Sequence, residues 1–367
     1  MTPPSATGRA PRVPLLMLGG LALGTGLWAG LARMGAAPAA PVSPMEHGPL
    51  MVSGFLGTVI ALERAVAARV TWALLGPACC GLGALALVAG RHQAGGVLLT
   101  LGSAVVLAVL AKLVARGLEL HEGILVLSCA MWLWGNALFA AGRAVHQVVP
   151  FWLVFLVGTI AAERLELNRL LPRTRGARAS FLAGFALLVA GAPLSLFSAD
   201  WGLRALGLGA LVLAGWMLAF DVARRTILMA GQVRYIAAAL LAGYVWLGVF
   251  GALALGLGNP LAGPHYDALM HAVLVGFVFS MIFGHALIIL PAVAGVRVPY
   301  KSRFYVHLAL LHGALAARLV GDFSGNLALR QGAAWASTFA IALFLGSTLW
   351  AALGPHQAPM FRKEVPQ

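Results

Sequence analysis

Two of the ten histidines, His47 and His271, stand at positions where the chain could bind a metal cofactor. His47 opens the second of the apolar stretches, and His271 lies one turn inside the tenth. Even-numbered membrane helices run in the same direction, so the two imidazoles are expected at a similar depth. Two imidazoles at one depth on neighbouring helices are what a six-coordinate b-type haem requires, with one nitrogen reaching the iron from each side. The alternative is a polar histidine at the membrane interface.

The surroundings of this pair also suit a flat cofactor. His47, Gly54 and Thr58 fall near one face of the second helix, and small residues there would admit a porphyrin or another backbone. Arg318 lies near the outer end of the eleventh helix and could hold a haem propionate through a bidentate contact. It could instead pair with Asp322, or extend its charged end to lipid headgroups.

A second group of ionisable residues is expected at the opposite side of the membrane. His285 follows His271 by fourteen residues, about 21 Å along a helix axis, so the two cannot serve one haem. His285 is expected near the depth of His121, Glu63 and Glu163. Ionisable groups inside lipid are functional candidates. We consider a second metal or haem site including His285 and His121, a polar network joining helix ends, and a proton path.

Composition defines the elements that must position these residues. Apolar residues make up 61% of the 367-residue chain and charged residues 10%, against roughly 25% charged in soluble domains. Repeated apolar runs of about twenty residues have the length needed to cross a bilayer as helices, and they lack the alternation of barrel strands. We predict an all-α, polytopic membrane bundle, a single transmembrane domain over residues 1–367, with about twelve helices at 13–34, 46–67, 70–89, 94–115, 122–142, 148–168, 179–198, 202–222, 234–257, 267–293, 303–321 and 331–352.

The cations are distributed unequally between the two sides of these spans. Nineteen of the 25 Lys and Arg residues fall on the side that holds both termini, and the other six are Arg33, Arg91, Arg143, Arg204, Arg318 and Arg330. The positive-inside rule places the first side, with both termini, in the cytoplasm. The net charge of +14 therefore reports topology, and no nucleic-acid partner is predicted. A cleaved signal peptide is the alternative for the first span, although its run is longer than a signal core of about 7–15 residues.

An internal repeat is predicted from short matches between helices two, six and ten. Ile60-Ala61-Leu62-Glu63-Arg64 is echoed one hundred residues later by Ile160-Ala161-Ala162-Glu163-Arg164. The tenth helix aligns more loosely: Gly54-Phe55 matches Gly276-Phe277, and Glu63 falls on His285. We predict three pseudo-repeats of four helices, over about 13–115, 116–225 and 233–353.

With twelve helices, a three-by-four repeat and histidines on helices two and ten, the chain resembles subunit I of the haem-copper oxidases. The segments YDALMHAVLVGFVFSMIFGHALIILP and HLALLHGALAARLVGD look most like the NnrS family of membrane haem proteins, and HGPLMVSGFLGTVIALERA is placed like that family's second helix. By position, His47 and His271 match the axial ligands of the low-spin haem, and Arg318 matches the arginines that hold propionates. The histidines that bind copper in helices six and seven of the oxidases are missing, as is the His-x-His pair of helix ten, so copper is not supported.

The resemblance implies haem b, a multi-pass location in the bacterial cytoplasmic (inner) membrane, and a role in nitric oxide or redox stress handling with a redox partner or quinol. Apart from the lipid bilayer, no other partner is indicated. A cofactor-free transporter or channel using Glu63, Glu163 and His285 is the alternative, and an assembly or sensor protein with purely structural histidines is a third. Whether the protein is an enzyme is left open by the sequence.

Overall fold

The structure, a computed structural model, describes residues 12–38, 42–115, 117, 119–168 and 174–353. All regular elements in these ranges are helices, and they contain no β-strand. Six of the cations used in the charge count lie outside the described residues: Arg9, Arg116, Arg169, Arg173, Arg362 and Lys363. The prediction of an all-α chain is confirmed.

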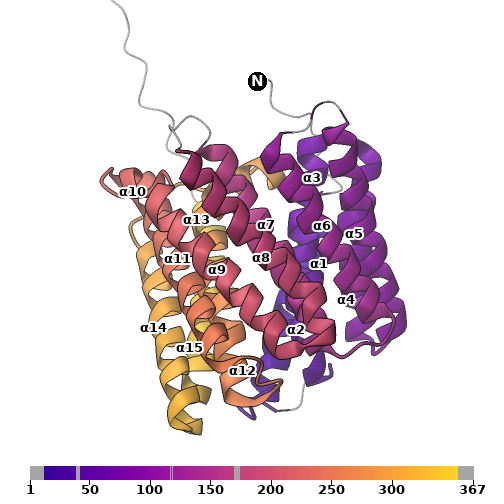
Figure 1. The fold of residues 1–367 in the computed structure, drawn as a ribbon, viewed down its shortest axis with the longest axis vertical. Coiled ribbons are helices and arrows are strands. Elements are labelled where there is room, and N and C mark those ends of the chain that lie inside the picture. Colours follow the sequence, from indigo (N-terminus) through magenta and orange to yellow (C-terminus); the bar gives the residue numbers. More distant parts are fainter. Residues whose placement is uncertain (1–11, 39–41, 116, 118, 169–173, 354–367) are drawn as a thin grey trace, which may run out of the picture.

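Twelve helical spans are long and apolar enough to cross a membrane, and their ends lie within four residues of the predicted ones. The protein is therefore a multi-pass membrane protein. Eight spans are single helices: α1 (Arg12–Arg33), α5 (His92–Val114), α6 (Leu120–Ala140), α7 (Val145–Leu167), α8 (Arg175–Phe197), α9 (Ala199–Phe220), α14 (Phe304–Ser324) and α15 (Leu327–Leu353). A ninth, α11 (Gly231–Leu257), follows the short helix α10 (Ala223–Thr226) (Figure 1).

The other three spans are built from several helical pieces. The third joins η4 (Thr71–Leu74) to α4 (Leu75–Val88). The second comprises η2 (Pro44–Glu46), α2 (His47–Pro49), η3 (Leu50–Leu56) and α3 (Gly57–Ala68), and the tenth comprises α12 (Gly263–His271), η5 (Ala272–Phe279) and α13 (Ser280–Ala294). The two predicted histidine-bearing helices are thus both interrupted. Their outer pieces, α2 and α12, lie at the same end of the bundle (Figure 1).

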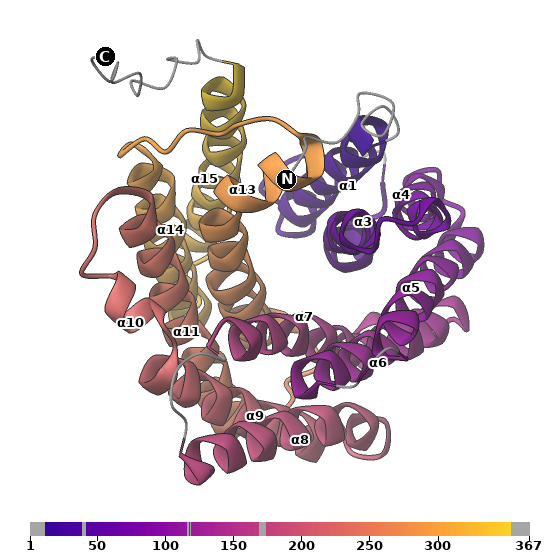
Figure 2. The ribbon, with the colours of Figure 1, turned by 90° about the horizontal axis from the view of Figure 1, so that it is seen from above.

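Helices two, six and ten meet around the middle of the bundle. Viewed from above, α3, α7 and α13 face the centre from three directions (Figure 2). The sixth span, α7, is the most buried, with 78% of its apolar window inside the protein. It begins at Val145, three residues earlier than predicted, so His146 lies in its first turn instead of preceding it.

The interruptions in spans two and ten are π-helical segments, a rare geometry that often marks functional sites. They are η3, which starts three residues after His47, and η5, which starts one residue after His271. Just after each π-helical segment, a side-chain hydroxyl donates to the carbonyl of a glycine within the segment. Side chains commonly satisfy backbone groups in this way where a membrane helix loses its regular backbone hydrogen bonds. Thr58 donates to Gly54 at 2.5 Å, and Ser280 donates to Gly276 at 2.5 Å.

These two hydroxyl contacts are related by the same 222-residue offset that aligns Gly54-Phe55 with Gly276-Phe277. With the same offset, η3 aligns with residues 272–278, which lie within η5. Spans two and ten therefore share a backbone irregularity and its side-chain support. The repeat boundaries themselves stay a prediction.

A buried polar network connects η3 to α5, α6 and α7. Ser53 in η3 donates to Asn136 Oδ1 at 2.8 Å and accepts from Trp132 Nε1 at 3.0 Å. Asn136 Oδ1 also accepts from Trp152 Nε1 at 2.9 Å, and its Nδ2 donates to Ser103 Oγ at 3.2 Å. Satisfied buried networks of this kind fix one packing arrangement, and this one holds the segment that directly follows His47.

Candidate functional site

The structure brings His47 and His271 together. Their ring centroids lie 6.2 Å apart and their planes differ by 9°. This separation exceeds the roughly 3.5–4 Å between touching atoms, so the two rings are close and parallel without being packed face to face. The predicted convergence of the two imidazoles is a feature of this fold.

Hydrogen bonds set the tautomer of both rings. His47 Nδ1 lies 2.7 Å from the Gly26 carbonyl, and His271 Nδ1 lies 2.8 Å from the Asp267 carbonyl. A carbonyl can only accept, so each Nδ1 carries the proton and each Nε2 keeps a lone pair. Neither Nε2 has a hydrogen-bond partner among the described residues. Metal-ligating histidines commonly show this arrangement, with the second nitrogen donating to a carbonyl.

The spacing suits an iron atom between the rings. Two metal–nitrogen bonds of about 2.0–2.1 Å in line, plus about 1.1 Å from each nitrogen to its ring centre, separate the centroids by roughly 6.3 Å. The observed 6.2 Å agrees with this value. Further inward the same two spans meet through Phe55 and Phe279, whose centroids are also 6.2 Å apart. The aromatic pair gives the site an apolar inner boundary.

Arg318 lies beside the pair, but its carboxylate partner is Asp267 and not the expected alternative, Asp322. It binds Asp267 through Nη2 at 2.5 Å and Nε at 3.2 Å, whereas Asp322 binds Arg330 Nε at 2.5 Å. Pairing of Arg318 with Asp322 was therefore wrong. Its Nη1 has no partner among the described residues, so contact with a propionate stays a prediction. Sequence reasoning missed Asp267, although its position four residues before His271 on one helix was a usable signal.

The first helix supplies a support that sequence reasoning also missed. The Gly26 carbonyl holds His47, and a Cβ added at Gly30 would lie 2.8 Å from the His47 ring. Gly26 and Gly30 form a GxxxG pattern, which lets helices approach closely in membranes. This GxxxG spacing could have indicated from the sequence that the first helix packs closely against the helix of His47.

Replacement of Gly30 by leucine is expected to displace the His47 ring, because the new side chain would occupy its place. The ring would lose its bond to Gly26, and binding of the haem expected from the sequence should weaken at least tenfold, as for other supports of metal ligands. Haem content per purified protein measures the effect. Gly24→Leu is the matched control, since a Cβ at Gly24 meets nothing within 4 Å. Equal retention of haem by both variants would show that Gly30 does not position His47.

The opposite side of the bundle holds a second ionic cluster. Arg64 forms an ion pair with Glu163 and lies 3.6 Å from Glu63. Arg164 Nη2 lies 3.0 Å from His285 Nε2, and His285 Nδ1 donates to the Met281 carbonyl at 2.7 Å. Both ring nitrogens of His285 are therefore engaged, so the residue has no free nitrogen for a metal. The cluster is a polar network joining α3, α7 and α13, one of the predicted alternatives.

The two arginine contacts follow the order of the predicted repeats. Arg64 of the first unit contacts Glu163 of the second unit. Arg164 of the second unit contacts His285 of the third unit, and His285 aligns with Glu63 and Glu163 in the repeat. The third unit has Ala286 where the others have arginine, so the chain of contacts stops there. A three-fold arrangement of helices two, six and ten would produce this head-to-tail order.

Residues 12–353 match the model of a family described only as a domain of unknown function, DUF8744. The chain belongs to this family. No curated protein and no solved structure matches it.

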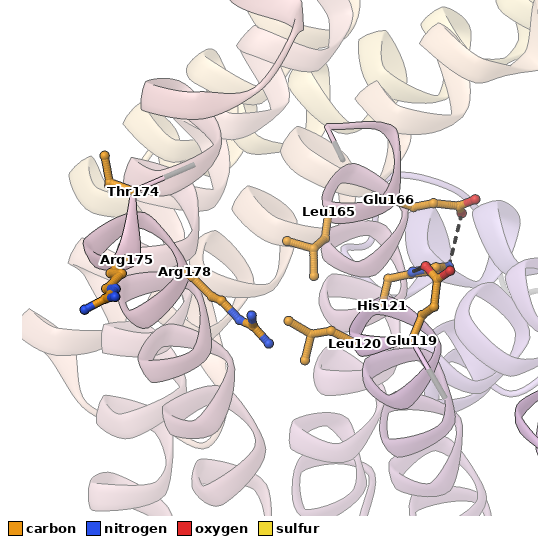
Figure 3. A pocket seen from close by; sticks show the side chains of 8 residues that line it. All are labelled: Glu119, Leu120, His121, Leu165, Glu166, Thr174, Arg175 and Arg178. Atoms are coloured by element: carbon orange, nitrogen blue, oxygen red, sulfur yellow. Dashed lines mark ion pairs between the residues drawn. The ribbon is translucent and has the colours of Figure 1, made fainter. Parts of the chain in front are cut away.

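His121 has carboxylate partners other than those of His271 and Arg64. It lines a cavity of about 420 Å³ at the ends of α6, α7 and α8, with Arg175 and Arg178 across from it (Figure 3). Its Nδ1 lies 3.3 Å from Glu119 and its Nε2 lies 3.7 Å from Glu166. Within the described residues, no group of three or more His, Cys, Asp or Glu side chains could hold a metal ion. The suggested metal-binding role of His121 therefore gains no support, and a bare metal between His47 and His271 would lack further protein ligands.

Proposed function

We propose that this protein binds one b-type haem between His47 and His271, near the outer surface of a bacterial cytoplasmic membrane. The observation that carries the proposal is the pair of parallel imidazoles 6.2 Å apart, each with its Nδ1 proton committed to a carbonyl. A porphyrin would supply the four ligands that the protein does not, which suits a site with only two protein donors. When bound, a haem with two histidine ligands supplies one-electron chemistry.

The residues of the chain would perform three tasks at this site. The two histidines would hold the haem iron, and the carbonyls of Gly26 and Asp267 fix the orientation of their rings. Phe55 and Phe279 limit access from the membrane interior. With His47 and His271 both serving as ligands, a bound haem would be suited to electron transfer rather than to binding of oxygen. Its exchange partner would be a redox protein at the outer surface or a quinol, in nitric oxide or redox stress handling.

A copper centre is not part of the proposal. The sixth span carries only His146, in its outermost turn, and the described part of the seventh carries no histidine. His307 and His312 on α14 bind aromatic partners: His307 Nε2 lies 3.1 Å from the Tyr235 hydroxyl, and His312 Nδ1 accepts from Trp246 at 2.9 Å.

Purified protein from haem-replete cells, or apoprotein titrated with haem b, tests the proposal. We expect a Soret band that saturates at one haem per chain and a low-spin spectrum in both oxidation states. A protein that neither retains haem nor shifts the Soret band on titration would refute it.

A transporter without cofactor is the second candidate, motivated by Glu63, Glu163 and His285 inside the bundle. Two of these three side chains are held by arginines from neighbouring helices, as in a structural cluster. Solute uptake into proteoliposomes that is lost in Glu63→Gln, in protein that binds no haem, would favour the transporter.

A further inference from the structure

We propose that Asp267 is a positioning residue that orients and polarises the His271 imidazole, making the two axial ligands electronically unequal. The inference rests on the proposed haem site. It concerns how the protein sets the reduction potential of that site.

Asp267 contacts the same ring nitrogen twice. Its backbone carbonyl accepts the Nδ1 proton of His271 at 2.8 Å, and its carboxylate Oδ1 lies 3.3 Å from that nitrogen. The four-residue spacing on α12 brings both groups to one face of the helix. The ring is thus fixed by the backbone and polarised by a negative charge.

Two arginines hold the carboxylate in this orientation. Arg318 contacts Oδ2 through Nη2 at 2.5 Å and Nε at 3.2 Å, and Arg330 Nη2 lies 3.6 Å from the same oxygen. Arg330 is itself held by Asp322, whose side chain is fully buried. With Oδ2 occupied by cations, Oδ1 remains directed at His271. Arg318 also draws negative charge away from Oδ1, so it moderates the effect of Asp267.

Among the described residues, His47 Nδ1 bonds only the Gly26 carbonyl and contacts no carboxylate. Carboxylate–histidine–metal groupings raise the basicity of the ligating nitrogen. His271 is therefore the more electron-rich ligand, and it favours ferric over ferrous iron.

The test is a redox titration of the haem-loaded, full-length protein and three variants. Asp267→Asn keeps the size of the side chain and the backbone contact but removes the charge. We expect haem to be retained and the preference for ferrous iron to rise about tenfold, which is about 59 mV upward for a one-electron couple. Arg318→Gln removes the cation that neutralises the Asp267 carboxylate, so we expect the reduction potential of the haem to move downward.

Asp322→Asn is the control for charge alone, because Asp322 contacts Arg330 and not His271. We expect its shift to be several-fold smaller than that of Asp267→Asn. Equal shifts for the two aspartate variants, unchanged potentials, or shifts of the same sign in Asp267→Asn and Arg318→Gln would overturn the inference. Absence of haem from the wild-type protein would instead refute the proposed function, so the two failures are distinguishable.

Discussion

Replacement of either His47 or His271 by glycine is expected to abolish the low-spin spectrum and leave haem held by one ligand. Each histidine of the 6.2 Å pair would supply one of the two protein ligands of the haem. We expect more than a hundredfold loss of haem affinity, beyond the roughly 10–100-fold cost of removing a supporting residue. Absorption spectra and haem titration of the purified variants measure both effects.

Added imidazole provides a specific rescue. It should enter the space left by the missing side chain and restore the low-spin spectrum in both glycine variants. His265→Ala is the control, because His265 is exposed, lies six residues before His271, and contacts Phe323. If the glycine variants keep the wild-type spectrum, or if His265→Ala loses it equally, these two histidines are not the axial ligands.

Glu163→Gln is expected to destabilise the fold more than Glu63→Gln, although both carboxylates lie near Arg64. Glu163 is the closest partner of Arg64, and the exposed fraction of the Arg64 side chain is 17%. Removing one member of a buried pair costs about 3–5 kcal/mol, since the other charge stays behind. Glu63 lies 3.6 Å from Arg64 and would retain part of the compensation, so we expect a loss of about 2 kcal/mol in the free energy of unfolding.

Unfolding by denaturing detergent, followed in mild detergent micelles, measures this loss. Glu63→Gln is the matched control, because Arg64 then keeps its close contact with Glu163. Its effect should be less than half as large. Equal stabilities for the two variants would show that the contact between α3 and α7 contributes nothing, and that the head-to-tail order of the arginines is incidental.

The spans were predictable from sequence because helix length and apolar character are local properties. The meeting of His47 and His271 was predictable because even-numbered spans run in parallel and both residues lie near their outer ends. The partner of Arg318, in contrast, was not predictable from the sequence. Asp322 is close in sequence, but Asp267, 51 residues away, is the carboxylate that the packing of α12 on α14 brings to Arg318.

The π-helical segments of spans two and ten could not be predicted from the sequence either. Residues 272–279 are a continuous apolar run and residues 50–56 are apolar apart from Ser53, and nothing in their composition distinguishes a π-helical segment from a regular helix. The matching hydroxyls of Thr58 and Ser280 become meaningful only once the carbonyls of Gly54 and Gly276 are seen to accept them. The same holds for Arg64 and Arg164, whose partners lie on other helices.

Electron paramagnetic resonance of the ferric, haem-loaded protein tests the central claim most directly. Two imidazole planes that differ by only 9° donate into the same iron d orbital and separate it in energy from its neighbour. We therefore predict a rhombic low-spin signal, lost in His47→Gly and His271→Gly. A high-spin signal in the wild-type protein, the highly anisotropic low-spin signal of perpendicular imidazoles, or no haem signal would contradict the account.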